Sequence, residues 1–112
     1  MDKIVERSVL FDFYGNLLTE HQRNIYEDIV NNDYSLTEIG EEFGISRQGV
    51  HDAVKRIDKI LLDYEDKLHC VKSYNESLEK IDLIKDRISV MKNKGIDVSE
   101  LEKLIDGLTE GL

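Results

Sequence analysis

The chain has 112 residues, enough for one domain with a modest core or for a small domain with an appendage. Its 24 acidic and 15 basic residues give a net charge of -9, the wrong sign for a protein that binds nucleic acid through bulk electrostatics alone. Proline is absent, helix-forming residues recur with a period of about 3.6 residues, and no segment alternates as a strand does. These features predict an all-α fold.

The N-terminal segment and the cysteine content bear on the compartment. The first ten residues contain no apolar run long enough for a signal peptide or a membrane span. Cys70 is the single cysteine, which excludes a disulfide within the chain. We therefore expect a cytoplasmic protein.

An apolar stripe predicts a first helix over residues 2–14, which Gly15 ends. The stripe that we expect to be buried comprises Val5, Val9, Leu10, Phe13 and, after the turn, Leu17. Phe11 is the aromatic residue least suited to the core. With Phe13 and Tyr14 it could instead form a surface for a partner, although apolar side chains at helical spacing more often pack inside.

A second helix is predicted to begin after Thr19, because Thr19 and Gln22 have the spacing of a capping box. It runs to about Asn31, where three polar residues break it. The side chains that it should bury are Ile25, Tyr26, Ile29 and Val30.

Residues 36–55 have the spacing of a helix-turn-helix, the motif that sets its second helix in the DNA major groove. Gly40 lies where the two helices must approach closely, and Gly44 ends the first helix where a left-handed backbone favours glycine. Ser35, with Glu38 three residues on, and Ser46 are suited to cap the two helices. The expected inward-facing residues are Ile39, Phe43, Ile45 at the turn, Val50 and Ala53.

The predicted DNA-binding residues lie on the second helix of this motif: Ser46, Arg47, Gln48, His51, Lys55 and Arg56. Arg47 and Gln48 are candidate base readers, because Arg pairs bidentately with guanine and Gln with adenine. Ser46 and the two later cations are suited to phosphates. Four basic and two acidic residues give residues 46–60 a local charge of +2. A helix-turn-helix used only for packing or for protein contact is the alternative.

Residues 17–61 resemble region 4 of bacterial sigma factors, and with the flanking segments FDFYGNLLT and LLDYEDKL the chain resembles YlxM-type proteins. The resemblance is carried by Phe11, Asp12, Phe13, Tyr14, Leu18, Gln22, Arg23, Tyr34, Ser35, Leu36, Glu38, Ile39, Ser46, Arg47, Gln48 and Val50. It covers the first seventy residues well, and the remainder only in length and helical character. Gly40 departs from the pattern, which commonly has Ala there.

YlxM-type proteins are small bacterial helix-turn-helix proteins, usually encoded beside the genes of the signal recognition particle. The resemblance implies a DNA-binding regulatory protein that acts in the signal recognition particle pathway. The alternative is a helical accessory protein that binds a protein or ribonucleoprotein, with the signal recognition particle as the first candidate. For that alternative, the substitutions that impair partner binding should be those at Phe11, at Tyr14 or in the C-terminal arm.

Beyond Lys55 the apolar residues continue at heptad-like steps to Met91, without Gly or Pro before Gly95. One helix over this stretch would be about 66 Å long, so a coiled-coil dimer or a fold-back is needed to bury the stripe. We expect a break within residues 69–73, with Ser73 and Glu76 capping a new helix. A homodimer through this arm and a helical bundle within one chain both explain the heptads.

Gly95 is predicted to end the arm in a Schellman motif, with Ile96 contacting Met91. A short last helix should follow, capped by Ser99 and Glu102, and pack against the arm or a partner chain. Its apolar face comprises Leu101, Leu104, Ile105 and Leu108. The predicted division is thus a helix-turn-helix domain, 1–66, and a dimerisation arm, 67–112.

The motifs of enzymes are missing from the sequence. It has no glycine-rich phosphate loop, no nucleophile motif and no pair of metal ligands at helical spacing. His69 and Cys70 are adjacent, and adjacent side chains on a helix point about 100° apart, which disfavours a shared metal. We therefore expect no enzyme, cofactor or metal.

Overall fold

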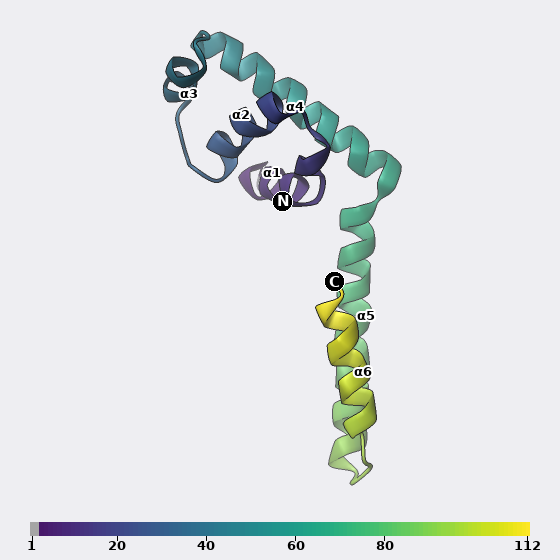
Figure 1. The fold of residues 1–112 in the computed structure, drawn as a ribbon. Helices are drawn as coiled ribbons and strands as arrows, with labels where there is room; N and C mark the ends of the chain where they lie inside the picture. The colour runs from purple at the N-terminus through teal and green to yellow at the C-terminus, as the bar shows by residue number, and fades with distance from the viewer. Residues whose placement is uncertain (1–2) are drawn as a thin grey trace. The chain divides into compact units, whose positions relative to one another are not determined.

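The computed structural model describes residues 3–112, and this range contains six α-helices, one 3-10 turn and no strand. The predicted all-α fold is confirmed. The chain divides into two compact units, an N-terminal unit that ends at Val71 and a C-terminal hairpin over Lys72–Leu112. Figure 1 shows the helices of each unit.

Helix α1 spans Lys3–Tyr14 and is followed by the 3-10 turn η1, Gly15–Leu17. Helix α2 spans Glu20–Val30 and begins with the predicted capping box. The Thr19 hydroxyl accepts from the Gln22 backbone N–H, and the Gln22 side chain accepts from the Thr19 backbone N–H. Both orphan donors are thereby satisfied at the start of the helix.

Helix α3 spans Leu36–Phe43, and α4 spans Arg47–Leu68. The caps again follow the prediction, because Ser35 forms a capping box with Glu38 and Ser46 accepts a hydrogen bond from the Gly49 N–H. Gly44 adopts a left-handed backbone with a φ of 72°. Helix α4 packs against α1, α2 and α3, so it is the central helix of the N-terminal unit (Figure 1).

The core of the N-terminal unit collects side chains from all four helices and from Leu18, which directly follows η1. The buried members are Leu10, Tyr14, Leu18, Ile25, Tyr26, Ile39, Val50, Val54, Ile57 and Leu61. Ile29 and Val30 are partly buried against this core rather than inside it. Ile45, expected to face inward at the turn, remains 39% exposed.

The predicted apolar stripe of α1 is wrong in most of its members. Leu10 is buried, but Val5, Phe13 and Leu17 are exposed, and Tyr14 lies inside in their place. Burial of this tyrosine is possible because its hydroxyl donates to a Glu65 carboxylate oxygen at 2.5 Å. The helix therefore turns Leu10 and Tyr14, four residues apart, toward α4.

Helix α5 spans Cys70–Asn93, and the break before it falls at His69, within the predicted range. The predicted Ser73 cap is wrong, because α5 already begins at Cys70. The Cys70 N–H donates to the Tyr14 hydroxyl at 3.1 Å, and the Val71 N–H donates to Glu65 at 3.0 Å. These bonds satisfy two first-turn donors, so the helix starts without a serine cap.

Helices α5 and α6, Ser99–Glu110, form the C-terminal hairpin. As predicted, a Schellman motif ends α5: the Gly95 N–H donates to Lys92 and the Ile96 N–H to Met91. Val98, Ile105, Ile81 and Ile88 form a second small core, so α6 packs on α5 of its own chain.

The predicted capping box at the start of α6 is wrong. The Ser99 N–H and hydroxyl both donate to Asp97 Oδ1, at 3.0 and 2.8 Å. A hydroxyl that donates to a neighbouring carboxylate is not the acceptor that a capping box requires.

Candidate nucleic-acid interface

The turn between α3 and α4 depends on Gly40. The Ile45 N–H donates to the Gly40 carbonyl at 2.9 Å, and a Cβ built on Gly40 would lie 2.6 Å from the Ile45 carbonyl oxygen. Any larger residue would push the turn away from α3. The close approach predicted for Gly40 is confirmed, and it leaves no room in this chain for the alanine that is common in the sigma-like pattern.

The beginning of α4 presents Arg47 and Gln48 to solvent. Both side chains are exposed, as base readers must be before DNA is bound. Ser46 has a different role, because its hydroxyl accepts from the Gly49 N–H at 3.0 Å and so caps the helix. A phosphate contact from this hydroxyl would have to be made while it holds the cap.

Gln48 is oriented by its neighbours on α4. Its Nε2 donates to Asp52 Oδ1 at 3.0 Å and lies 3.5 Å from His51 Nδ1. The half-buried His51 is also 3.6 Å from the Asp52 carboxylate. The structure thus joins Gln48, His51 and Asp52 in one cluster of polar side chains on α4.

Lys55 and Arg56 are exposed on different sides of α4. Arg56 lines a 260 Å³ hollow with His21 and Gln22 of α2. Lys55 lines another hollow, together with Lys59 one turn later. Lys59 was not among the predicted site residues, although the spacing of 48, 55 and 59 places all three on one face of the helix.

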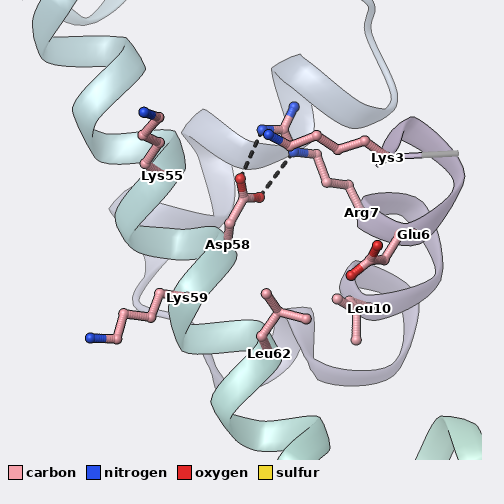
Figure 2. A pocket seen from close by; sticks show the side chains of 8 residues that line it. All are labelled: Lys3, Glu6, Arg7, Leu10, Lys55, Asp58, Lys59 and Leu62. Atoms are coloured by element: carbon pink, nitrogen blue, oxygen red, sulfur yellow. Dashed lines mark hydrogen bonds and ion pairs between the residues drawn. The ribbon is translucent and has the colours of Figure 1, made fainter. Parts of the chain in front are cut away.

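The hollow beside Lys55 lies between α1 and α4 and has a volume of 470 Å³ (Figure 2). Its lining residues are Lys3, Glu6, Arg7, Leu10, Lys55, Asp58, Lys59 and Leu62. Figure 2 shows that Lys55 and Lys59 point outward from α4. These two ammonium groups are therefore placed for a ligand on the outer surface of α4.

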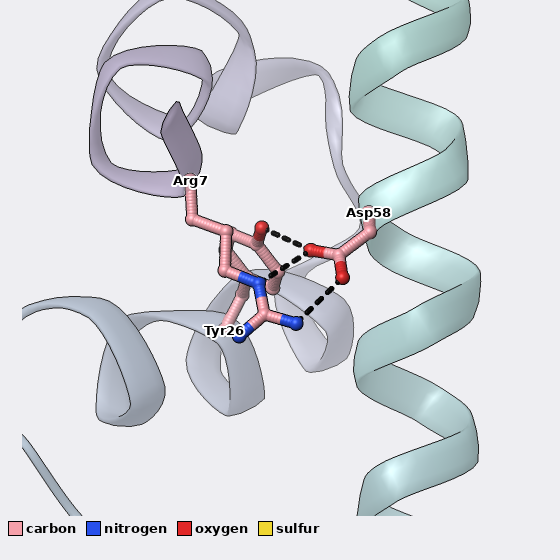
Figure 3. Close-up of polar contacts among 3 residues, drawn as sticks. All are labelled: Arg7, Tyr26 and Asp58. Atoms are coloured by element: carbon pink, nitrogen blue, oxygen red, sulfur yellow. Dashed lines mark hydrogen bonds and ion pairs between the residues drawn. The ribbon is translucent and has the colours of Figure 1, made fainter. Parts of the chain in front are cut away.

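Asp58 lies among these cations and is held by two other helices (Figure 3). Arg7 donates to its two oxygens at 3.0 and 2.7 Å, and the Tyr26 hydroxyl donates to Oδ1 at 2.5 Å. The bonds to Asp58 raise the pKa of Arg7. Burial, followed by the hydrogen bond to Asp58, raises the pKa of Tyr26, so this hydroxyl stays protonated and keeps donating.

This network changes the electrostatics predicted for α4. The sequence reasoning counted Asp58 against the cations of α4 but missed Arg7, which lies 51 residues away. With Arg7 included, five basic side chains stand against Asp52 and Asp58. The local charge is therefore +3, and the bidentate pairing of Asp58 reduces its repulsion of phosphate.

The remainder of the N-terminal unit is acidic. Residues 1–71 contain 8 basic and 15 acidic residues, a net charge of -7, whereas Lys72–Leu112 contains 7 basic and 9 acidic residues, a net charge of -2. Glu38, Glu41 and Glu42 are exposed on α3. These carboxylates would repel a phosphate backbone, so α4 carries a better surface for DNA than α3.

The family model described as "Putative helix-turn-helix protein, YlxM / p13 like", UPF0122, matches residues 1–101. The chain belongs to this family. The match includes α5 and the start of α6, so the UPF0122 likeness extends well beyond the seventy residues that carried the resemblance in the sequence.

Three relatives illustrate the similarity. A UPF0122 protein of Thermoanaerobacter sp. strain X514 is 44% identical over 105 residues, which cover 94% of this chain and 89% of the relative. A UPF0122 protein of Caldanaerobacter subterraneus is 51% identical over 78% of this chain and 74% of the relative. One of Streptococcus gordonii is 49% identical over 72% and 76%, respectively.

Residues 3–112 of this UPF0122 protein contain neither a metal-binding cluster nor a membrane-spanning helix. No group of three or more His, Cys, Asp or Glu side chains in that range could hold a metal ion. None of the helices described there is both long enough and apolar enough to cross a membrane.

Proposed function

We propose that this UPF0122 protein is a DNA-binding regulatory protein that reads duplex DNA with the start of α4 and acts as a homodimer. The observation that carries the proposal is the close approach of the turn to Gly40, which holds α3 against the base of α4. Arg47 and Gln48 are left exposed at the start of α4, where residues 46–60 together with Arg7 of α1 have a local charge of +3. A fixed, capped and locally basic helix is what major-groove reading needs.

Each DNA-binding residue has a role in this proposal. Arg47 and Gln48 contact base edges, and the hydrogen bond from Gln48 to Asp52 restricts the orientation of the Gln48 amide. Lys55 and Arg56 contact phosphates, and Lys59 joins them. His51 supports Gln48 from the half-buried side of the helix. Ser46 caps α4 by accepting from the Gly49 N–H, which fixes the start of the helix.

The test is selection from a random duplex DNA library by the purified protein at near-physiological salt. We expect an enriched motif, and Arg47→Ala should weaken binding to that motif by about 1–3 kcal/mol. Lys67→Ala is the matched control, because Lys67 is an exposed cation in the last turn of the same helix and should leave the motif unchanged. Inverted half-sites about 34 Å apart, or a multiple of that, would be the signature of the homodimer.

The second candidate function is that of an accessory protein that binds a protein or ribonucleoprotein. The net charge of -7 on residues 1–71 and the acidic surface of α3 favour it. A folded protein that enriches no DNA motif would support this candidate and overturn the first. Substitutions should then weaken partner binding at the partly buried Phe11, at the arm, and at the exposed Phe13 in place of Tyr14, which is buried.

Participation in the signal recognition particle pathway is also proposed, and it is supported by the resemblance to YlxM-type proteins. Titration of the purified protein with assembled signal recognition particle, with its RNA alone and with its protein alone distinguishes a physical partner from a shared process. Saturable binding to one of these components would establish a contact. If none of the three binds, the proposed link is confined to gene regulation.

A further inference from the structure

An apolar groove runs along the C-terminal hairpin between α5 and α6. It has a volume of 360 Å³ and is lined by Leu83, Ile84, Arg87, Ile88, Met91, Leu101, Leu104 and Ile105. Arg87 is the one charged side chain in this lining. Helix α5 contributes five of these residues and α6 three, so the groove is a surface of the hairpin as a whole and not of one helix.

The apolar side chains around the groove are more exposed to solvent than is usual for the surface of a monomeric protein. Leu83 is 66% exposed, Leu104 is 63% exposed and the nearby Leu108 is 51% exposed. Together with Ile84 and Leu101, which are 42% and 40% exposed, they form one continuous apolar patch on the two helices. Monomeric soluble proteins rarely leave more than a few hundred Å² of contiguous apolar surface uncovered, and larger patches mark interaction sites.

The hairpin is also too small to be stable on its own core. Only Ile81, Ile88, Val98 and Ile105 are buried within it. Segments of about 40 residues usually need a disulfide, a metal or oligomerisation to fold, and isolated helices as short as α6 are marginal in water. Cys70 is the only cysteine in the sequence and no metal cluster occurs in residues 3–112, so oligomerisation is the remaining means.

The charges of the hairpin suit a second copy of the same hairpin. Helix α5 carries five basic and four acidic residues, whereas α6 carries one basic and four acidic residues. The two helices are therefore complementary when α5 of one copy lies against α6 of the other. The hairpin as a whole has a net charge of only -2, so two hairpins repel each other far less than two N-terminal units would.

We propose that this groove binds a second copy of the chain through the same groove, in an isologous four-helix arrangement with α5 of each copy against α6 of the other. The proposal rests on the homodimer in the proposed function, and it adds the surface, the pairing of the helices and the charge that orients them. Leu83 and Leu104 lie inside the interface, and Arg87 faces the acidic α6 of the partner. Two-fold symmetry lets the same apolar patch cover itself.

The test is the molar mass of the full chain, measured by sedimentation equilibrium over a range of micromolar concentrations. We expect the wild-type protein to have the mass of a dimer. Leu83→Glu and Leu104→Glu, one on each helix, should each weaken the dimer by at least ~100-fold, because each buries two like charges in an apolar interface. Leu17→Glu is the control, since Leu17 is 54% exposed in the N-terminal unit and should leave the dimer unchanged.

A further variant tests the orientation of the helices. Arg87→Glu adds a negative charge opposite α6 and should weaken the dimer about tenfold. Unchanged or tighter association of this variant would overturn the pairing of α5 with α6. A monomeric wild-type protein with intact helix content, or a dimer that survives both leucine substitutions, would overturn the groove as the interface.

These measurements are independent of DNA binding. Arg47→Ala should dimerise like the wild-type protein while losing the selected motif, and Leu104→Glu should lose the dimer while its α4 surface stays folded. Circular dichroism and the hydrogen exchange of the α4 amides show whether each variant keeps its helices. Failure of the dimer and failure of DNA reading are therefore seen in different variants and by different measurements.

Discussion

The N-terminal unit and the C-terminal hairpin are built from the same element, the amphipathic helix, but they are held together differently. Ten buried apolar residues form the core of the first, and only four form the core of the second. The N-terminal unit also has hydrogen bonds and an ion pair between its helices, such as those of Asp58 with Arg7 and Tyr26. The ion pair between the hairpin helices, Lys92 with Glu102, is exposed and 3.5 Å long.

This difference in core size and polar contacts indicates which part of the chain specifies its own structure. A core with contributions from α1, α2, α3 and α4 leaves few alternative arrangements of the helix-turn-helix. The hairpin buries one row of side chains and leaves a second row exposed, so its packing is incomplete in one chain.

Truncation of a core side chain should give the largest effect. Leu61 is completely buried, and Leu61→Ala should lower the free energy of unfolding of the N-terminal unit by about 2–5 kcal/mol, as measured by urea titration. Ile88→Ala should instead act locally, with faster hydrogen exchange in α6 and unchanged protection in α4. Loss of α4 protection in the Ile88→Ala variant would contradict the independence of the two units.

Removal of the hydrogen bonds and ion pairs between helices should give the second largest difference in stability between the two units. Asp58→Ala leaves the Arg7 guanidinium and the Tyr26 hydroxyl without their shared acceptor in a partly buried site, and it should cost about 2–3 kcal/mol. Glu102→Ala breaks an exposed pair and should cost less than about 0.5 kcal/mol. Thermal unfolding of both variants at constant pH measures the stability that each one loses. Equal losses in the two variants would contradict the prediction.

Local signals in the sequence were enough for much of the fold. The capping boxes at Thr19 and Ser35 and the left-handed turns at Gly44 and Gly95 each depend on a few neighbouring residues, and all four were predicted. Contacts between distant residues were not predictable. The choice of Tyr14 over Phe13 for the core depends on Glu65, which lies 51 residues along the chain.

In the candidate site, too, features set by neighbouring residues could be predicted from the sequence, and contacts between distant residues could not. Exposure of Arg47 and Gln48 follows from helical periodicity and was expected from the sequence. The pairing of Asp58 with Arg7 could not be expected from the sequence, because the two residues are 51 positions apart and no local pattern joins them. Lys59 could have been found, since its spacing from Lys55 is one helical turn.

Glycines in the two units should respond oppositely to alanine. A Cβ on Gly40 would meet the Ile45 carbonyl oxygen at 2.6 Å, so Gly40→Ala should destabilise the N-terminal unit by about 1–2 kcal/mol despite the gain in helix propensity. Gly107, inside α6, has no atom within 4 Å of its Cβ position. Gly107→Ala should therefore stabilise α6 by about 0.5–1 kcal/mol, as seen in slower hydrogen exchange. Stabilisation by Gly40→Ala would refute the close approach.

The two units should also respond oppositely to acid, and this is the smallest expected effect because both groups are exposed. The hydrogen bond that a protonated Glu42 would donate to the Asp28 carboxylate raises the pKa of Glu42 above 4.5. Its contribution to stability is therefore full below that value and is lost as pH rises through the raised pKa. Hydrogen bonds from Ser99 lower the pKa of Asp97 below 3.8, so its contribution is full above 3.8 and is lost as pH falls through the lowered value.

Acidification from neutral pH should consequently tighten the contact between α2 and α3 before it weakens the start of α6. Hydrogen exchange of the α3 and α6 amides between neutral pH and pH 3, corrected for the intrinsic rate, measures both changes in one sample. Glu42→Gln should remove the gain at α3, and Asp97→Asn should remove the loss at α6. Because the two signs follow from which partner each carboxyl has, a change of the same sign in both units would contradict the assigned hydrogen bonds.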